Sequence, residues 1–394
     1  MRVFAAALLC ALPFAAADAA PDACAHLAKL VETAPPGPVF LASYPTAGPG
    51  PLANTAFLYD NALAVLALTG CGERARAERI GQAILFAQDN DRFWKDGRLR
   101  NAYAAGSAKE KPAKLSGWWD TAQNRWLEDR YQAGSDVGNQ AWAMLALLAL
   151  DKPGPETPYR TGALRIAGWI LQWRDSRGAG GFTGGVIGHE PGPEPRRWKS
   201  TEHNTDLAAA FALLAERTGD AKWRDAAGQA GHFVETMWDA HRHCFFAGTG
   251  DDGVTPNPTL SLDAQVWPLT ALPGAAQKFG AVLATLDDKL SASGGYAYGE
   301  QRDGIWTEGT AQAALLQEKL GNKDKSRALL SVIETQRSPD GGYYATSTQG
   351  LPTGYGQESD PSKPRLYFRL PHLGAAAWMA LAERGFDPFS QKSL

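Results

Sequence analysis

Six apolar runs, rich in Ala and Leu, recur along the chain, and each opens with a cluster of polar residues. The runs begin near residues 60, 138, 204, 262, 308 and 373. Apolar side chains surround almost the whole circumference of each run, so a helix formed there would be buried on most sides. The pattern therefore predicts six buried helices that share a polar first turn.

A more polar, amphipathic segment precedes each apolar run. These segments span residues 22–34, 74–88, 158–174, 221–238, 274–290 and 323–336. In the fourth segment Trp223, Ala226 and Phe233 recur at helical spacing on one stripe. Pro268 interrupts the fourth apolar run, and we expect that helix either to kink there or to begin later. The sequence thus predicts twelve helices that are alternately exposed and buried.

Six helix pairs can close into an inner ring within an outer ring, or they can stack as an open superhelix. The last apolar run is as apolar as those in the middle of the chain, whereas an open stack would need a polar capping end. We therefore predict an all-α chain folded as an (α/α)6 barrel, with residues 21–394 as a single domain.

The connections between the predicted helices are unequal in length. Those that lead from an outer to an inner helix are long and rich in Gly and aromatic residues, as in 178–203, 244–262, 294–307 and 339–372. The return connections at 219–220 and 321–322 are short turns. All the long loops must then gather at one rim, at the N-terminal ends of the inner helices, where we expect the functional site.

Carboxylic residues open several of the inner helices and would meet at this rim. The candidates for catalytic acid or base are Glu202, Asp263, Asp60, Asp136 and Glu308. The candidates for substrate binding are Tyr59, Trp118, Trp119, Asn139, Trp198, His203, Asp206, Gln265, Trp267, Trp306, Tyr367, Arg369 and His372. Carboxylates and amides hold sugar hydroxyls, and indole rings stack on sugar C–H faces, so this mixture suits a carbohydrate.

Glycoside hydrolysis needs one carboxylic acid that is kept protonated and a second carboxylate that acts as nucleophile or base. Glu202 is the first candidate for the acid, because it ends a long loop and precedes the longest uninterrupted inner helix. Each carboxylate could instead cap or stabilise its helix N-terminus. The Trp residues could equally lie in the core, and Arg369 and His372 could form salt bridges at a helix entry.

Two segments carry a resemblance to a known superfamily. Residues 199–206 read Lys-Ser-Thr-Glu-His-Asn-Thr-Asp, and residues 306–312 read Trp-Thr-Glu-Gly-Thr-Ala-Gln. Together with the alternation of twelve helices and the Gly-Gly-aromatic loops, they resemble the six-hairpin glycosidase superfamily over about residues 22–390. The resemblance implies an (α/α)6 barrel and carbohydrate-active chemistry, often with inversion of the anomeric centre. No motif assigns a particular family or substrate.

The N-terminal residues 1–20 match a secretory signal peptide, with Arg2 before an apolar run and small residues at its end. We expect the mature protein to be exported to the periplasm or the medium and to have no membrane attachment. Of the remaining cysteines, Cys24 and Cys71 could form a disulfide, which would leave Cys244 as a buried thiol. Three cysteines without a C-x-x-C pair argue against a structural zinc site.

Composition and charge narrow the function further. The 394 residues carry 39 Lys and Arg against 42 Asp and Glu, which leaves no basic footprint for nucleic acid. The sequence has no phosphate-binding loop, no dinucleotide-binding motif and no H-E-x-x-H metal motif. We therefore expect no cofactor and no metal, and a monomer whose partner is a polysaccharide or oligosaccharide.

The leading hypothesis is a glycoside hydrolase. The first alternative is a polysaccharide lyase on a similar helical toroid, in which Tyr59, His203, Arg369 and His372 could supply the base and neutralise a uronate. The second alternative is a non-catalytic glycan-binding protein of an exopolysaccharide system, in which the carboxylates are structural.

Overall fold

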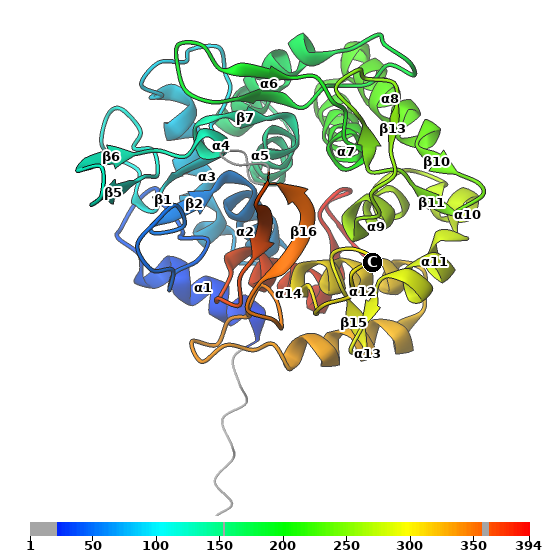
Figure 1. Cartoon of the computed structure of the whole chain (residues 1–394). Helices are drawn as coiled ribbons and strands as arrows, with labels where there is room; N and C mark the ends of the chain where they lie inside the picture. The colour runs from blue at the N-terminus through cyan, green and yellow to red at the C-terminus, as the bar shows by residue number, and fades with distance from the viewer. Residues whose placement is uncertain (1–21, 153, 357–361) are drawn as a thin grey trace, which may run out of the picture.

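The computed structural model describes residues 22–152, 154–356 and 362–394, and helices predominate in them. Six of these helices are buried nearly all round and form an inner ring. They are α2 (Leu58–Gly70), α5 (Val137–Leu150), α7 (Thr201–Thr218), α9 (Leu262–Ala271), α12 (Thr307–Lys319) and α14 (Leu373–Arg384). Each packs against the next in this order, and α14 packs against α2 (Figure 1). The ring is therefore closed, which excludes the open superhelix.

An outer layer of helices covers the ring. Its members are α1 (Ala23–Thr33), α3 (Arg74–Asp89), α6 (Pro158–Ile170), α8 (Ala221–Thr236), α10 (Ala275–Phe279), α11 (Val282–Lys289) and α13 (Lys323–Glu334). A 3₁₀ turn, Leu171–Trp173, follows α6, and a short helix α4 (Arg130–Ala133) lies in a long loop. The stripe predicted on α8 is buried, including Trp223, Ala226 and Phe233.

The fourth helix pair departs from the predicted pattern. Helix α9 begins at Leu262, so the predicted later start is wrong, and its ten residues make it the shortest inner helix. Pro268 inside it has no N–H to donate to the carbonyl four residues earlier. The single outer helix predicted over 274–290 is two short helices, α10 and α11, with Gly280, a weak helix former, at the break. Both pack against α9.

The long loops form small antiparallel sheets that the sequence reasoning did not predict. The two-stranded pairs are β1 (Val39–Phe40) with β4 (Gly106–Ser107), β2 (Thr55–Phe57) with β3 (Ala102–Ala104), β5 (Trp118–Asp120) with β6 (Arg125–Leu127), β10 (Trp238–Asp239) with β11 (Cys244–Phe245), β12 (Gly248–Thr249) with β13 (Pro256–Asn257), β14 (Ser291–Ala292) with β15 (Gly295–Tyr296), β16 (Leu351–Gly356) with β17 (Pro364–Tyr367), and β18 (Phe386–Asp387) with β19 (Lys392–Ser393). A three-stranded sheet joins β7 (Ser135–Asp136), β8 (Gly185–Ile187) and β9 (Glu194–Arg196). The chain is thus mainly helical, with its strands confined to loops and to the chain end.

The fourth residue of most inner helices fastens the preceding loop to the ring. In four helices it is an amide that bonds both the N–H and the C=O of one loop residue at 2.7–3.0 Å: Asn61 with Leu41, Gln140 with Leu99, Asn204 with Phe182, and Gln265 with Phe245. In α12 the hydroxyl of Thr310 bonds Tyr296 in the same way. We call these five the clamp residues. Their side chains are fully buried, so their polarity serves the fold.

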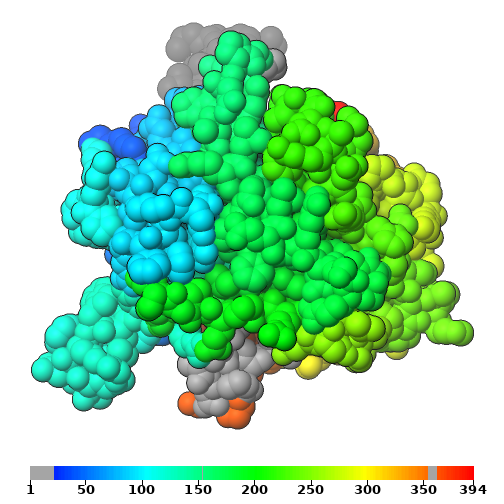
Figure 2. Space-filling model, turned by 90° about the horizontal axis from the view of Figure 1, so that it is seen from above, coloured from blue at the N-terminus to red at the C-terminus, as the bar shows by residue number. Residues whose placement is uncertain are grey.

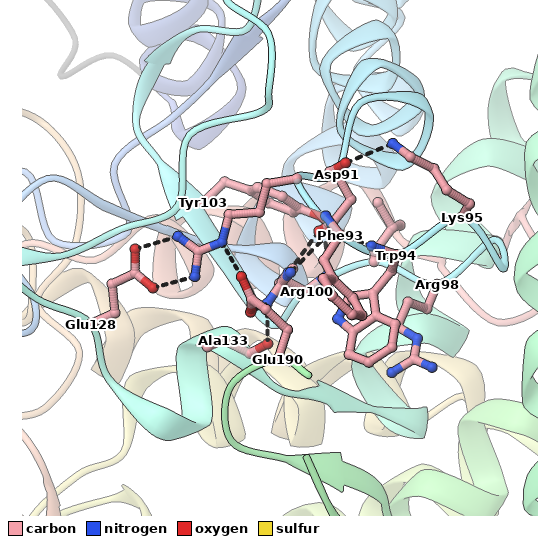
Figure 3. A network of polar contacts seen from close by, with 12 residues as sticks. Asp91, Phe93, Trp94, Lys95, Arg98, Arg100, Tyr103, Glu128, Ala133 and Glu190 are labelled. Carbon is pink, nitrogen blue, oxygen red and sulfur yellow. Dashed lines mark hydrogen bonds and ion pairs between the residues drawn. The ribbon is translucent and has the colours of Figure 1, made fainter. Parts of the chain in front are cut away.

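A buried ion-pair network ties three of the loops together (Figure 3). Arg100, whose side chain is fully buried, donates to both carboxylate oxygens of Asp91 at 2.6 and 2.9 Å and to Glu190 at 2.7 Å. Arg92 binds Glu128 through two bonds of 2.7 and 2.6 Å. A buried guanidinium is tolerated only when its charge is paired in this way. The network therefore holds the loops on either side of α4 in place.

The first and last helices of the chain lie against each other. Cys24 in α1 and Cys71 at the end of α2 form the predicted disulfide, and Cys244 is a buried free thiol. Helix α1 also packs on α14, where Arg384 binds Asp22 at 2.8 Å. The signal peptide predicted for residues 1–20 lies outside the described residues. Among the residues that the structure describes, no helix has the length and apolar character needed to cross a bilayer.

Candidate active site

A cavity of about 590 Å³ opens at the N-terminal ends of the inner helices. The hairpin of β16 and β17 lies across the front of the ring and contributes to the cavity wall (Figure 1). All five carboxylic residues predicted for catalysis line this cavity, namely Asp60, Asp136, Glu202, Asp263 and Glu308. It is also lined by eight of the predicted substrate-binding residues, namely Tyr59, Asn139, Trp198, His203, Trp267, Trp306, Tyr367 and His372.

The second residue of each inner helix has a distinct place. The six helices begin at the same rim, so residues at this one position are directed toward a common centre. They are Tyr59, Gly138, Glu202, Asp263, Glu308 and Gly374, and the first five line the cavity. Three consecutive helices of the ring, α7, α9 and α12, therefore each supply one acid to the cavity floor.

Glu202 and Asp263 form a carboxyl pair. They lie on neighbouring helices within hydrogen-bonding reach of each other. Burial and the charge of Asp263 raise the pKa of Glu202 well above its ordinary value. Burial also raises the pKa of Asp263, but the N–H of Ala264 donates to this carboxylate at 2.7 Å and favours its charged form. Within the pair, burial and the charge of its partner therefore favour the protonated form of Glu202, whereas hydrogen bonds favour the charged form of Asp263.

A second charged group surrounds His372, the residue that precedes α14. Its Nε2 lies 3.2 Å from Asp60 Oδ2, and its Nδ1 lies 3.3 Å from Glu308 Oε1. Burial alone would lower the pKa of His372, but the two carboxylates outweigh burial and raise it. Burial raises the pKa of Glu308 to about 7, although the charge of His372 acts in the opposite direction. Glu308 therefore changes its charge near neutral pH, next to an imidazolium.

Two glycines provide the space for these polar groups. A Cβ on Gly374 would lie 2.9 Å from each of Asp60 Oδ1, Glu308 Oε2 and His372 Cε1. A Cβ on Gly138 would lie 2.4 Å from the ring of His203. Both distances are shorter than real Cβ contacts. The two inner helices with glycine at their second position, α5 and α14, thus leave room for acids and histidines of neighbouring segments.

Asp136 and His203 lie on another side of the cavity. Asp136 forms an ion pair with Arg196 at 3.2 Å, and the guanidinium of Arg196 lies 5.3 Å from the ring centre of Trp198. Burial, followed by the charge of Arg196, lowers the pKa of His203 to about 3. Its imidazole is therefore neutral and offers one donor and one acceptor, as a sugar hydroxyl requires.

Aromatic rings support the acids from below. Trp267 is only 2% exposed, and its ring centre lies 5.2 Å from that of Trp142 and 6.1 Å from that of Trp378. Trp378 Nε1 donates to the hydroxyl of Tyr59 at 2.8 Å, and Tyr44 stacks on His372 at 4.3 Å. These rings exclude water from the carboxyl groups, which is the physical cause of their raised pKa values.

Five predicted residues lie outside the lining of the cavity, namely Trp118, Trp119, Asp206, Gln265 and Arg369. Gln265 is a clamp residue, so its polar atoms are bonded to backbone. Asp206 is fully buried one helical turn beyond Glu202, where burial, then the charges of Glu202 and Asp263, raises its pKa well above the ordinary range. We correct both residues from substrate binding to the interior of the fold.

The other three corrected residues lie on loops. Trp118 and Trp119 belong to the β5–β6 hairpin, on which Trp119 is 56% exposed. The guanidinium of Arg369 lies over the ring of Tyr344 at 4.0 Å. Sequence spacing alone gave no direction for these loop side chains. The salt bridge considered for a helix entry is found at His372, inside the cavity, and not at Arg369.

Sequence reasoning also missed residues that line the cavity, namely Tyr44, Phe57, Tyr131, Trp142, Arg196, Tyr298, Thr353 and Arg365. Most come from loops whose strands were not predicted. One signal was available, because Arg365 and Tyr367 are two residues apart on β17 and alternate residues of a strand share a face. Among the described residues, no group of three or more His, Cys, Asp or Glu side chains is arranged to hold a metal.

Comparison with protein-family models and with curated protein sequences finds no match. Solved structures, in contrast, share the fold over most of the chain. A cellobiose 2-epimerase from Spirochaeta thermophila DSM 6192 aligns with a TM-score of 0.63 at 14% identity, covering 92% of this chain and 93% of that chain. A glycosidase in complex with glucose gives 0.60 at 14% identity, covering 92% and 95%. An alpha-amylase from Clostridium perfringens gives 0.56 at 10% identity, covering 84% and 87%.

At these identities the likeness is one of fold. The solved structures therefore share this mainly helical fold with the chain, and they assign neither a superfamily nor a particular family to it.

Proposed function

We propose that the chain is a carbohydrate-active enzyme that hydrolyses glycosidic bonds in the cavity of an (α/α)6 barrel. The closed order of helix contacts supports the barrel. The observation that carries the activity is that Glu202 and Glu308 line one cavity, where burial raises the pKa of Glu202 well above its ordinary value and that of Glu308 to about 7. Glycoside hydrolysis requires this combination, since one carboxyl group must give a proton while another accepts one.

Glu202 is the proposed general acid. It retains its proton at neutral pH because burial and the neighbouring Asp263 carboxylate oppose its ionisation. Asp263 then acts as the partner that holds the proton on Glu202. These two carboxyl groups are within hydrogen-bonding reach of each other, whereas the two groups that flank a scissile bond stand about 5 Å apart or more. The second catalytic group is therefore a different carboxylate.

Glu308 is the proposed general base. Its pKa of about 7 makes it a stronger base than an ordinary carboxylate, and proton transfer is most efficient when this pKa lies near the working pH. His372 and Asp60 position it from one side. A base that activates water rather than attacking the sugar gives inversion, which is the stereochemical outcome we propose. Asp136, paired with Arg196, is assigned to substrate binding rather than to proton transfer.

We further propose that residues 1–20 direct export, that residues 21–394 act as one domain, and that the mature protein is a monomer in the periplasm or medium. The Cys24–Cys71 disulfide supports an oxidising compartment.

A sugar epimerase is the second candidate function. It is favoured by the two histidines of the cavity, one neutral and one held as an imidazolium, since proton exchange next to a carbonyl needs a base and an acid. Cellobiose 2-epimerases also share the fold.

One experiment separates these functions. Purified residues 21–394 are incubated with starch, xylan, carboxymethylcellulose, polygalacturonate and cellobiose in D₂O, and products are followed by reducing ends, ultraviolet absorbance and proton NMR. We expect new reducing ends that disappear in Glu202→Gln and Glu308→Gln. Deuterium incorporation next to the anomeric carbon without cleavage would support the epimerase, and an absorbance rise would support the lyase. Full activity of either variant on a cleaved substrate would refute the proposed mechanism.

A further inference from the structure

The β5–β6 hairpin exposes two large aromatic side chains on one of its faces. Trp119 is 56% exposed and Trp126 is 54% exposed. The two residues are direct partners in the register of the hairpin, and directly opposed residues of an antiparallel pair point to the same face. Two adjacent exposed indoles are unusual on a soluble surface and indicate a binding function.

The hairpin is held in shape without a ligand. A Cβ on Gly117 would lie 2.6 Å from Cε2 and Nε1 of Trp126, so that ring lies directly against the backbone of the hairpin. At the turn, Asp120 Oδ1 accepts from the N–H of Gln123 at 2.8 Å, and Arg125 donates to Gln123 at 2.6 Å. A preformed face loses less conformational entropy when it binds a ligand.

The location of this face relates it to the cavity. Figure 2 shows the hairpin region, coloured teal, as a lobe that projects from the body on the same side as the orange residues of the β16–β17 hairpin. That second hairpin contributes Thr353 and Arg365 to the cavity wall. Strand β6 also leads directly into α4, whose Tyr131 lines the cavity. The β5–β6 hairpin and the β16–β17 hairpin of the cavity wall therefore project on one side of the molecule.

The exposed area of the two Trp side chains indicates which kind of ligand they bind. Two half-exposed Trp side chains offer about 150–250 Å² of surface, since this is the area that one whole aromatic side chain can bury. A stable protein dimer needs about 800 Å² from each partner. A sugar ring, in contrast, is covered by one indole.

We propose that Trp119 and Trp126 form an accessory binding site for a polysaccharide chain, which we call the tryptophan platform. This inference deepens the proposed function, because it makes the substrate a polymer that is held outside the cavity as well as inside it. Trp119, which the sequence predicted as a substrate-binding residue, is thus reassigned to a separate site together with Trp126.

Affinity electrophoresis tests the platform without requiring catalysis. Glu202→Gln protein is run in native gels that contain soluble starch, xylan, carboxymethylcellulose or polygalacturonate. We expect at least one polymer to retard it, and we expect W119A/W126A, made in the same background, to bind that polymer about tenfold more weakly, since each ring contributes about 0.5–1.5 kcal/mol. W119Y/W126Y keeps a flat ring at each position and should retain most of the retardation. The Phe93→Ala variant lacks another exposed aromatic residue, and the polymer should retard it as strongly as its parent.

Two results would overturn the platform. One is the absence of retardation by all four polymers, or retardation that is equal in W119A/W126A and its parent while circular dichroism shows both folded. The other is a wild-type dimer in light scattering that becomes a monomer in W119A/W126A, which would assign the face to a second copy of the chain. Retardation that depends on the two Trp residues, combined with no hydrolysis by the wild type, would leave the platform standing and refute the hydrolase.

Discussion

Most of the second and fourth residues of the inner helices are polar, but the two positions have different roles. Two positions along an α-helix correspond to a rotation of about 200°, so these residues lie on opposite sides of the same first turn. The fourth residues face the loops and are nearly alike, and backbone groups satisfy their hydrogen bonds. The second residues face the cavity, differ between helices, and include acids with displaced pKa values. The residues that are alike from helix to helix thus serve the structure, and the residues that differ between helices form the candidate active site.

The largest expected effect tests the chemical role of the second residues. Replacing the proposed acid in Glu202→Gln removes the transferable proton and should lower kcat/KM by about 10²–10⁴-fold. The melting temperature should not fall, because the change also removes a buried carboxyl that burial disfavours in its charged form. Steady-state kinetics together with calorimetry measure both quantities.

The structural side is tested by Gln265→Ala. This change leaves the N–H and C=O of Phe245 without partners in the interior, which should lower the free energy of unfolding by about 2–4 kcal/mol. Chemical denaturation measures the loss, and kcat/KM of the remaining folded protein should change little. An unaltered stability together with a lost activity would return Gln265 to the substrate-binding role predicted from sequence.

Gly374→Ala extends the comparison, because Gly374 is the second residue of α14 and has no reactive side chain. Its Cβ would meet Asp60, Glu308 and His372, and the resulting displacement should reduce kcat by about 10²-fold. Gly228→Ala is the matched control, since that Cβ has nothing within 4 Å, and activity should stay at the wild-type level. Equal activity of the two variants would contradict the tight packing of the charged group.

The smallest effect concerns pH. With a pKa of about 7, Glu308 is increasingly protonated below neutrality, so a base-dependent activity should fall on the acidic side of pH 7. The imidazolium of His372 lowers this pKa, so His372→Asn should move the acidic limb of kcat/KM upward by about one pH unit. His203→Asn removes a neutral ring and should leave the limb in place. A limb that shifts equally in both variants would remove Glu308 from the role of base.

Hydrophobic periodicity was enough to predict the alternation of buried and amphipathic segments and the closed order of the inner helices, although the fourth outer segment forms two helices instead of one. Alternation between apolar and amphipathic segments is a local property, and the predicted starts of α7 and α12 lie within three residues of the observed ones. It also brought all five predicted acids into one cavity. The direction in which a side chain points from its helix was harder to predict, because a shift of one or two residues in the helix start decides whether a residue such as Gln265 faces the cavity or the loop.

The loops could not be predicted in the same way. Their strands are only two to six residues long, and pairs such as β1 with β4 join segments far apart in the sequence. Cavity residues such as Tyr44 and Arg365 owe their position to these contacts. The raised pKa of Glu202 depends in part on Asp263, which is 61 residues away in the sequence, and no local pattern reports this contact.

The contact of α14 with α2 has a mechanical consequence. In a linear array the terminal repeats have one neighbour and can detach first, so the array frays inward. Here every inner helix packs against two neighbouring inner helices, and α14 also packs against α1. In the described part of the chain, no inner helix lies at the end of a row and could detach first, so we expect thermal unfolding in a single cooperative step. A circularly permuted chain, opened at another short turn, should fold into the same ring.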